Sequence, residues 1–131
     1  MTPERTFWEL IKDHLPGDVS RIENGADEGT PDVSGAYGRD YWVELKVCFN
    51  KRDLAQVPSL LLASQVVWHL RRARHGSIIY VAVRYPNMKR IIFYEYRKGD
   101  GIYYPIINLI SKGGFNWHDF EHKFKTILRE A

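Results

Sequence analysis

The chain has 131 residues, of which 44% are hydrophobic and 27% are charged, and its formal net charge at pH 7 is +3. This length fits one domain, so we expect a single domain over residues 1–131. The mild positive charge is compatible with an anionic partner such as nucleic acid, whereas the single cysteine, Cys48, excludes an internal disulfide framework.

The hydropathy pattern contains no segment with the length of a membrane span and no signal-peptide pattern. A single cysteine also fits a reducing compartment. We therefore expect no membrane partner and a cytoplasmic location, which would be the host cytoplasm for a phage-encoded protein.

The first half of the chain predicts a helix followed by three strands. Thr2 precedes Pro3 in a typical helix start, and apolar residues recur at helical spacing as far as Leu15. A Pro-Gly pair then ends the pattern. Period-two patterns predict strands over 19–23, 32–36 and 41–48, with a loop over 24–30 between the first two.

The second half predicts a helix, further strands and a last helix. A polar loop over 49–58 leads to a helix over 65–75, for which Ser64 is the expected N-cap. Apolar strands are expected over 77–84 and 90–96, and a short strand over 103–109. The last helix ends near residue 129, and either Asn116 or Asp119 caps its start.

Two charged residues interrupt an apolar strand at alternate positions. Glu44 and Lys46 project to the same face, because residues i and i+2 of a strand share a face. Asp32 opens the preceding strand, and a hairpin would bring it beside Glu44. Mg²⁺ is usually held by one or two carboxylates plus substrate phosphate, so the pattern predicts a metal-dependent phosphodiesterase. The alternative is a solvated strand face with a weak ion pair.

These residues resemble the PD-(D/E)xK nuclease superfamily, with Pro31-Asp32 followed by Glu44-x-Lys46. The longer pattern resembles its VRR-NUC branch, and in particular the short stand-alone proteins of phages and bacteria. That pattern comprises Gly29-Thr30-Pro31-Asp32-Val33, Trp42-Val43-Glu44-Leu45-Lys46, Ser64-Gln65, Glu4-x-x-Phe7-Trp8 and Arg21-Ile22-Glu23-Asn24.

The resemblance covers residues 4 to 84, and no motif is placed from Pro86 onward. It implies one nuclease domain with the α/β core order helix, three strands, helix, strand (αβββαβ), followed here by an added C-terminal strand and helix. Local patterns alone indicate only a mixed α/β domain.

The resemblance also implies roles for the site residues. Asp32 and Glu44 would bind Mg²⁺, for which Mn²⁺ would substitute, and the backbone carbonyl of Leu45 would add a third oxygen. The metal would polarise the scissile phosphate and lower the pKa of a bound water. Lys46 would hold that water or stabilise charge on the phosphorane.

Three further residues have both a functional and an ordinary interpretation. Glu4 matches the acidic residue that often completes the site from the first helix, although an acid in a first turn also stabilises the helix dipole; Glu9 is the alternative to Glu4. Glu23 would flank the site as a metal ligand, or it pairs with Arg21. Gln65 would orient the water or touch phosphate, or it is ordinary helix surface.

The basic and histidine residues complete the candidate set. Four arginines are expected to bind DNA phosphates, or they form a solvated surface: Arg71, Arg72, Arg74 and Arg84. His118 and His122 have the spacing of zinc ligands on a helix, but no third ligand is evident and we expect no zinc. His69 is expected to pack at the edge of the core.

Within the resemblance, the expected activity is a structure-selective DNA endonuclease acting on branched DNA such as a Holliday junction. Cutting two strands needs two sites, so a homodimer is expected, with the apolar strands over 78–96 as the pairing surface. The alternatives are a nickase, a restriction-type or single-strand nuclease, or a catalytically silent nucleic-acid-binding module.

Overall fold

The computed structural model describes residues 1–22, 28–50, 52–97 and 100–131. Its principal elements follow the predicted order of helix, three strands, helix and strand, with two more strands and a helix at the end. They are α1 (Pro3–Ile11), β1 (Asp18–Arg21), β2 (Val33–Ala36), β3 (Asp40–Val47), α2 (Val57–Leu60), α3 (Ala63–Arg74), β4 (Ile78–Tyr85), β5 (Arg90–Tyr96), β6 (Tyr103–Ile110) and α4 (Trp117–Glu130). Two short 3-10 helices, η1 (Lys12–His14) and η2 (Pro86–Met88), complete the list.

The six strands form one sheet in the order β1-β2-β3-β4-β5-β6. Neighbouring strands are antiparallel except for β3 and β4, which are parallel. A parallel pair needs a long crossover, and here it carries α2 and α3. The predicted α/β core is confirmed, and β5, β6 and α4 extend it toward the C-terminus.

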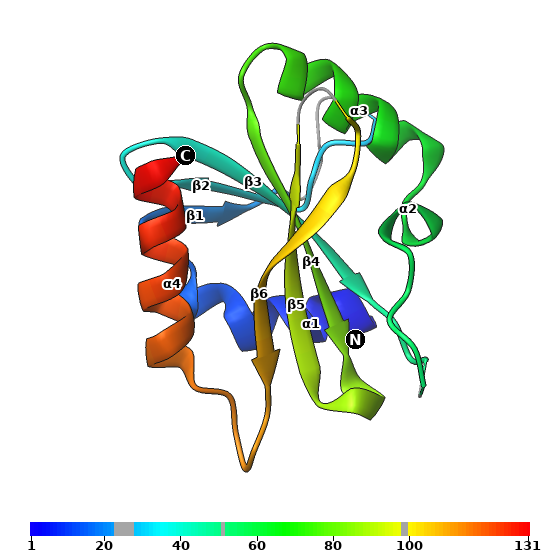
Figure 1. Cartoon of the computed structure of the whole chain (residues 1–131), viewed down its shortest axis with the longest axis vertical. Helices are drawn as coiled ribbons and strands as arrows, with labels where there is room; N and C mark the ends of the chain where they lie inside the picture. The colour runs from blue at the N-terminus through cyan, green and yellow to red at the C-terminus, as the bar shows by residue number, and fades with distance from the viewer. Residues whose placement is uncertain (23–27, 51, 98–99) are drawn as a thin grey trace.

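Helices cover both faces of the sheet (Figure 1). On one face α1 and α4 pack against the odd-numbered residues of β3, which are Tyr41, Val43 and Leu45. On the other face α3 packs through Trp68. Because successive strand residues point to opposite faces, Glu44 and Lys46 project to the α3 side.

The start of α3 differs from the prediction. Thr2 accepts a hydrogen bond from the Arg5 amide at the start of α1 (3.1 Å), and Asn116 caps α4 by accepting from the Asp119 amide (3.0 Å). In α3, by contrast, Leu62 rather than Ser64 occupies the N-cap position. Its side chain cannot cap, and its amide instead donates to the Gln65 side chain at 2.8 Å.

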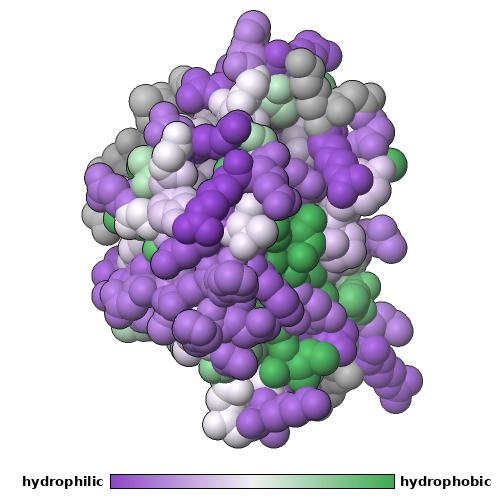
Figure 2. Space-filling view, turned by 60° about the vertical axis from the view of Figure 1, so that its left-hand side comes forward, coloured by the Kyte–Doolittle hydropathy of each residue, from purple (hydrophilic) through white to green (hydrophobic). Residues whose placement is uncertain are grey.

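The surface predicted to pair two copies is not exposed. Strands β4 and β5 lie inside the sheet, each flanked by strands on both sides. Their apolar side chains, for example Val81 and Phe93, are buried between the helices. The side of the molecule that α4 covers is mostly hydrophilic, with small hydrophobic patches (Figure 2). The prediction of a pairing surface over 78–96 was therefore wrong.

None of the helices in the described part of the chain is long and apolar enough to cross a membrane.

The β2–β3 hairpin depends on a close contact at Gly35. This residue lies opposite Tyr41, whose hydroxyl donates to the Pro16 carbonyl at 2.7 Å. A Cβ on Gly35 would lie 2.3 Å from the Tyr41 ring. We expect Gly35→Ala to displace this buried ring and to lower the free energy of unfolding by about 1–3 kcal/mol. Urea denaturation measures it, with Ser34→Ala as the control; equal stability of the two variants would contradict the packing role.

Candidate active site

The site forms where β2 ends and β3 continues. Pairing between the two strands stops at Val33 opposite Val43, so Asp32 is the next residue in register and lies opposite Glu44. Opposite residues of an antiparallel pair have Cβ atoms about 5 Å apart on one face. The structure therefore brings the two carboxylates together at an edge of β3 that β2 leaves open.

Asp32 is held in this position from both sides. One carboxylate oxygen accepts a hydrogen bond from the Leu45 amide at 2.8 Å, which replaces the strand pairing that has ended. The Asp32 carbonyl accepts from the Ile22 amide at 2.7 Å, in continuation of β1. The loop before it packs closely on α3, because a Cβ on Gly29 would lie 2.1 Å from the Ser64 carbonyl oxygen.

Glu44 is a buried carboxylate with incomplete pairing. The residue is 1% exposed, and its Oε2 atom has no hydrogen-bond partner. The pKa of Glu44 is raised to about 9, first by burial and then by the Asp32 carboxylate, while Lys46 opposes the rise. A buried carboxylate beside another carboxylate is stabilised in its charged form by a cation.

Gln65 connects this carboxylate to α3. Its Nε2 donates to Oε1 of Glu44 at 2.9 Å, and its Oε1 accepts from the Leu62 amide at 2.8 Å. The start of the helix therefore fixes the amide orientation and so positions Glu44. The interpretation of Gln65 as ordinary helix surface was wrong, because its side chain points into the carboxylate cluster.

Lys46 and Glu4 approach the cluster from different elements. The Lys46 ammonium lies 3.9 Å from Oε1 of Glu44, and its side chain is 17% exposed. Glu4, in the first turn of α1, is close enough to contribute to the raised pKa of Glu44. Because α1 and α3 cover opposite faces of the sheet, side chains of both helices approach the open edge of β3.

These donors fit a hard divalent cation. The Leu45 amide points to the open edge, and the carbonyl of a strand residue points to the same edge as its amide. Two carboxylates, one of which carries the unpartnered Oε2 of Glu44, and a backbone carbonyl are oxygen ligands of the kind Mg²⁺ prefers. Among the described residues no group of three His, Cys, Asp or Glu side chains forms a metal cluster, so substrate and water would supply the remaining ligands.

A histidine–tyrosine pair lies on the same face. His69 of α3 is fully buried, and its Nδ1 lies 2.7 Å from the Tyr103 hydroxyl. Burial lowers the pKa of His69 to about 4, with a further contribution from Lys46. Burial also raises the pKa of Tyr103 above its usual range, to which Glu44 contributes. No sequence pattern predicts this pair, because Tyr103 belongs to β6, 34 residues further along the chain.

The four candidate DNA-binding arginines fall into two groups. Arg71, Arg72 and Arg74 lie at the end of α3, where the Arg72 guanidinium stacks on Trp68 (4.8 Å) and on Trp42 (5.8 Å). Arg84 lies near the other end of β4, about 20 Å away along the strand. Along the strand direction, the carboxylate cluster lies between the two groups, opposite Val81 of β4, but Arg84 projects to the α1 face of the sheet.

Other candidates lie apart from the cluster. Glu9 is paired with Arg5 (3.3 Å) and Lys12 (2.6 Å) on the outer side of α1, so it is not the alternative to Glu4. Glu23 lies outside the described residues. His118 and His122 are exposed on α4 and form no metal cluster with the described residues.

Comparisons with known proteins give a remote structural likeness. No family model matches the chain, and no curated protein is similar to it. Among solved structures, the fold is similar to Hjc, a Holliday junction resolvase from the archaeal hyperthermophile Archaeoglobus fulgidus, with a TM-score of 0.45. Sequence identity is 19%, and the similarity covers 76% of this chain and 77% of that chain. A likeness this distant does not transfer residue roles or an activity.

The buried histidine makes stability depend on pH. Because the pKa of His69 is about 4 in the folded protein, against an ordinary value of 6.5, the unfolded chain binds its proton first. Stability from this residue is therefore complete above pH 6.5 and declines as the pH falls toward 4, by about 3 kcal/mol in total. We expect His69→Gln to flatten this dependence in urea titrations between pH 7 and 4. The control His122→Gln, at an exposed position, should leave this pH dependence unchanged. If the pH dependence of stability in His69→Gln equals that of the wild type, His69 is not the group responsible.

Proposed function

We propose that this protein is a metal-dependent endonuclease that hydrolyses phosphodiester bonds of DNA. The observation that carries the proposal is the buried Glu44 carboxylate, which lies opposite Asp32, is held by Gln65 and leaves one oxygen without a partner. Burial and the neighbouring Asp32 carboxylate raise the pKa of Glu44 to about 9, so the charged pair is costly without a counter-charge. A bound cation would supply that counter-charge.

In the proposed site, Asp32, Glu44 and the Leu45 carbonyl hold Mg²⁺, and Mn²⁺ substitutes for it. The bound metal supplies Lewis-acid activation of the phosphate and of a water. Gln65 and the Leu45 amide keep the two carboxylates in place. Lys46 is the cation next to the carboxylates, and it stabilises the negative charge that grows on the phosphorane. Glu4 adds negative potential from α1.

DNA is the proposed polymer, and branched DNA is the proposed preference. The motif resemblance supports both, and the basic groups on either side of the carboxylate cluster suit a phosphate backbone. Resolving a junction requires two strands to be cut, and each chain supplies one Asp32-Glu44-Lys46 cluster. We therefore also propose that the protein acts as a homodimer. The experiments below distinguish this proposal from its alternatives, which are a nickase, a restriction-type or single-strand nuclease, and a catalytically silent binding module.

Removal of the Lys46 ammonium group should abolish DNA cleavage without preventing DNA binding. We expect Lys46→Ala to lower the single-turnover rate by at least a hundredfold, which is about 2.7 kcal/mol of barrier, because Lys46 acts on the transition state. Lys112→Ala is the control, since Lys112 is exposed on the turn between β6 and α4. A Lys46→Ala rate within tenfold of the wild type would contradict the assignment.

Metal binding should depend on both carboxylates. We expect calorimetry to show Mg²⁺ or Mn²⁺ binding that weakens at least tenfold in Asp32→Asn and in Glu44→Gln, because each change removes a negative oxygen ligand. Cleavage should stop in EDTA, and Ca²⁺ should support DNA binding without efficient cleavage. Asp13→Asn, on the exposed η1 segment, is the control. Full activity in EDTA would exclude the metal mechanism.

Substrate preference and assembly can be tested together. We expect light scattering to give twice the chain mass of 15.4 kDa, and the protein to cut a four-way junction faster than a linear or flapped duplex of the same sequence. The reason is geometric, because symmetric incision needs two sites related by a twofold axis. A monomer that cuts all three substrates at one rate would be consistent with the nuclease assignment and would contradict the preference for junctions.

A further inference from the structure

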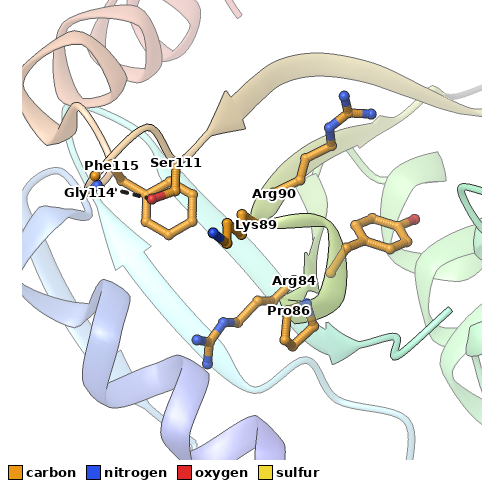
Figure 3. Close-up of a pocket in the computed structure, with 9 residues that line it drawn as sticks. Arg84, Pro86, Lys89, Arg90, Ser111, Gly114 and Phe115 are labelled. Carbon is orange, nitrogen blue, oxygen red and sulfur yellow. Dashed lines mark hydrogen bonds between the residues drawn. The ribbon is translucent and has the colours of Figure 1, made fainter. Parts of the chain in front are cut away.

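A basic pocket lies at the other end of β4 from the arginines of α3. It has a volume of about 330 Å³ and is lined by Arg84, Tyr85, Pro86, Lys89, Arg90, Ser111, Gly113, Gly114 and Phe115. None of these residues is acidic. The side chains of Arg84 and Lys89 point to the same side as Ser111, whereas the Arg90 guanidinium points away from them (Figure 3).

The walls of this pocket are fixed to one another. One wall is the η2 turn between β4 and β5, and the other is the turn after β6. The Ser111 amide donates to the Lys89 carbonyl at 2.8 Å and so joins the two turns. The Ser111 hydroxyl accepts from the Gly114 amide at 3.1 Å, which leaves its own hydrogen free to donate into the pocket.

Lys89 has an unusual backbone conformation for a side chain of its kind. Its φ of 51° and ψ of 49° are left-handed, and no other non-glycine residue in the described ranges has a positive φ. Glycine or asparagine adopts this conformation readily, whereas lysine pays about 1 kcal/mol. A strained backbone that presents a cation beside a second cation indicates a function for the side chain.

The two cations have no counter-charge in the protein. In the described part of the chain neither Arg84 nor Lys89 forms an ion pair, although the arginine is only partly exposed. An anion with several acceptor oxygens would accept hydrogen bonds from the Arg84 guanidinium, the Lys89 ammonium and the Ser111 hydroxyl together. A phosphate has this form.

We propose that the pocket formed by Arg84, Lys89 and Ser111 binds one backbone phosphate of the DNA substrate outside the bond that is cut. This inference rests on the proposed nuclease function. Arg84 lies beside Val47 on the neighbouring strand, three residues beyond Glu44. The separation along the strand is about 10 Å, and Arg84 projects with Leu45 and Val47 to the α1 face, whereas Glu44 projects to the α3 face. The DNA strand would cross the carboxyl ends of β3 and β4 to reach it.

The decisive variants are Lys89→Asn, which suits the left-handed backbone, and Arg84→Gln, whose main-chain carbonyl still accepts from the Cys48 amide. We expect the double variant to bind DNA at least tenfold more weakly at 0.1 M salt. The slope of log K against log salt should fall by about 0.9, as for one lost phosphate contact. Lys89→Asn should be no less thermostable than the wild type, because asparagine adopts the left-handed backbone readily.

A scan with methylphosphonates, which remove the charge of one phosphate at a time, locates the contact. One position outside the cut bond should weaken binding of the wild type and of Lys112→Asn, the neighbouring control, but not of the double variant. Equal weakening by Lys112→Asn and the double variant, or no position with this coupling, would overturn the proposal.

Inorganic phosphate separates failure of the pocket from failure of the proposed function. Added phosphate should shift the amide resonances of Ser111 and Gly114 in the wild type and not in the double variant. No shift in the wild type overturns the phosphate site. If phosphate binds but the chain cuts no nucleic acid, the pocket is an anion site while the nuclease assignment and the DNA contact both fail.

Discussion

The premature end of strand pairing between β2 and β3 determines the rest of this site. Had β2 continued, the Leu45 amide would have bonded to a main-chain carbonyl, and both edges of β3 would have been closed. Instead the Asp32 side chain takes that hydrogen bond at 2.8 Å, and its carboxylate is thereby fixed next to Glu44. One interaction therefore ends the hairpin and assembles the carboxylate pair.

Helix α3 completes the arrangement from the opposite direction. The Gln65 amide uses its oxygen to satisfy the Leu62 amide and its nitrogen to hold Glu44. The same side chain begins the helix and orients the acid, so the position of Glu44 is coupled to the packing of α3 on the sheet. His69 extends this coupling one turn further along the helix, where it meets Tyr103 of the last strand.

Local patterns predicted the elements well and the long-range contacts less well. The alternation around Glu44 and Lys46 and the spacing to Asp32 were sufficient to expect a hairpin with two adjacent carboxylates, because period and turn length are local properties. The short α2 and the Leu62 N-cap were missed, since Ser64 is the better cap by residue type and only the contact with Gln65 reverses that preference. The burial of β4 and β5 depends on β6, whose pattern is irregular and whose register shifts near Phe93.

The parallel pairing of β3 with β4 has a consequence for the order of assembly during synthesis. The first 47 residues contain Glu4, Asp32, Glu44 and Lys46, and all but Glu4 belong to one antiparallel hairpin that can form early. Gln65 arrives only with the crossover, and β4 must then insert beside β3 before α3 can cover Glu44. Parallel pairing of strands separated by so long a connection is slow relative to hairpin formation. A nascent chain therefore holds its acidic pair solvated and loosely oriented, and it acquires a rigid, desolvated carboxylate only after its second half has emerged.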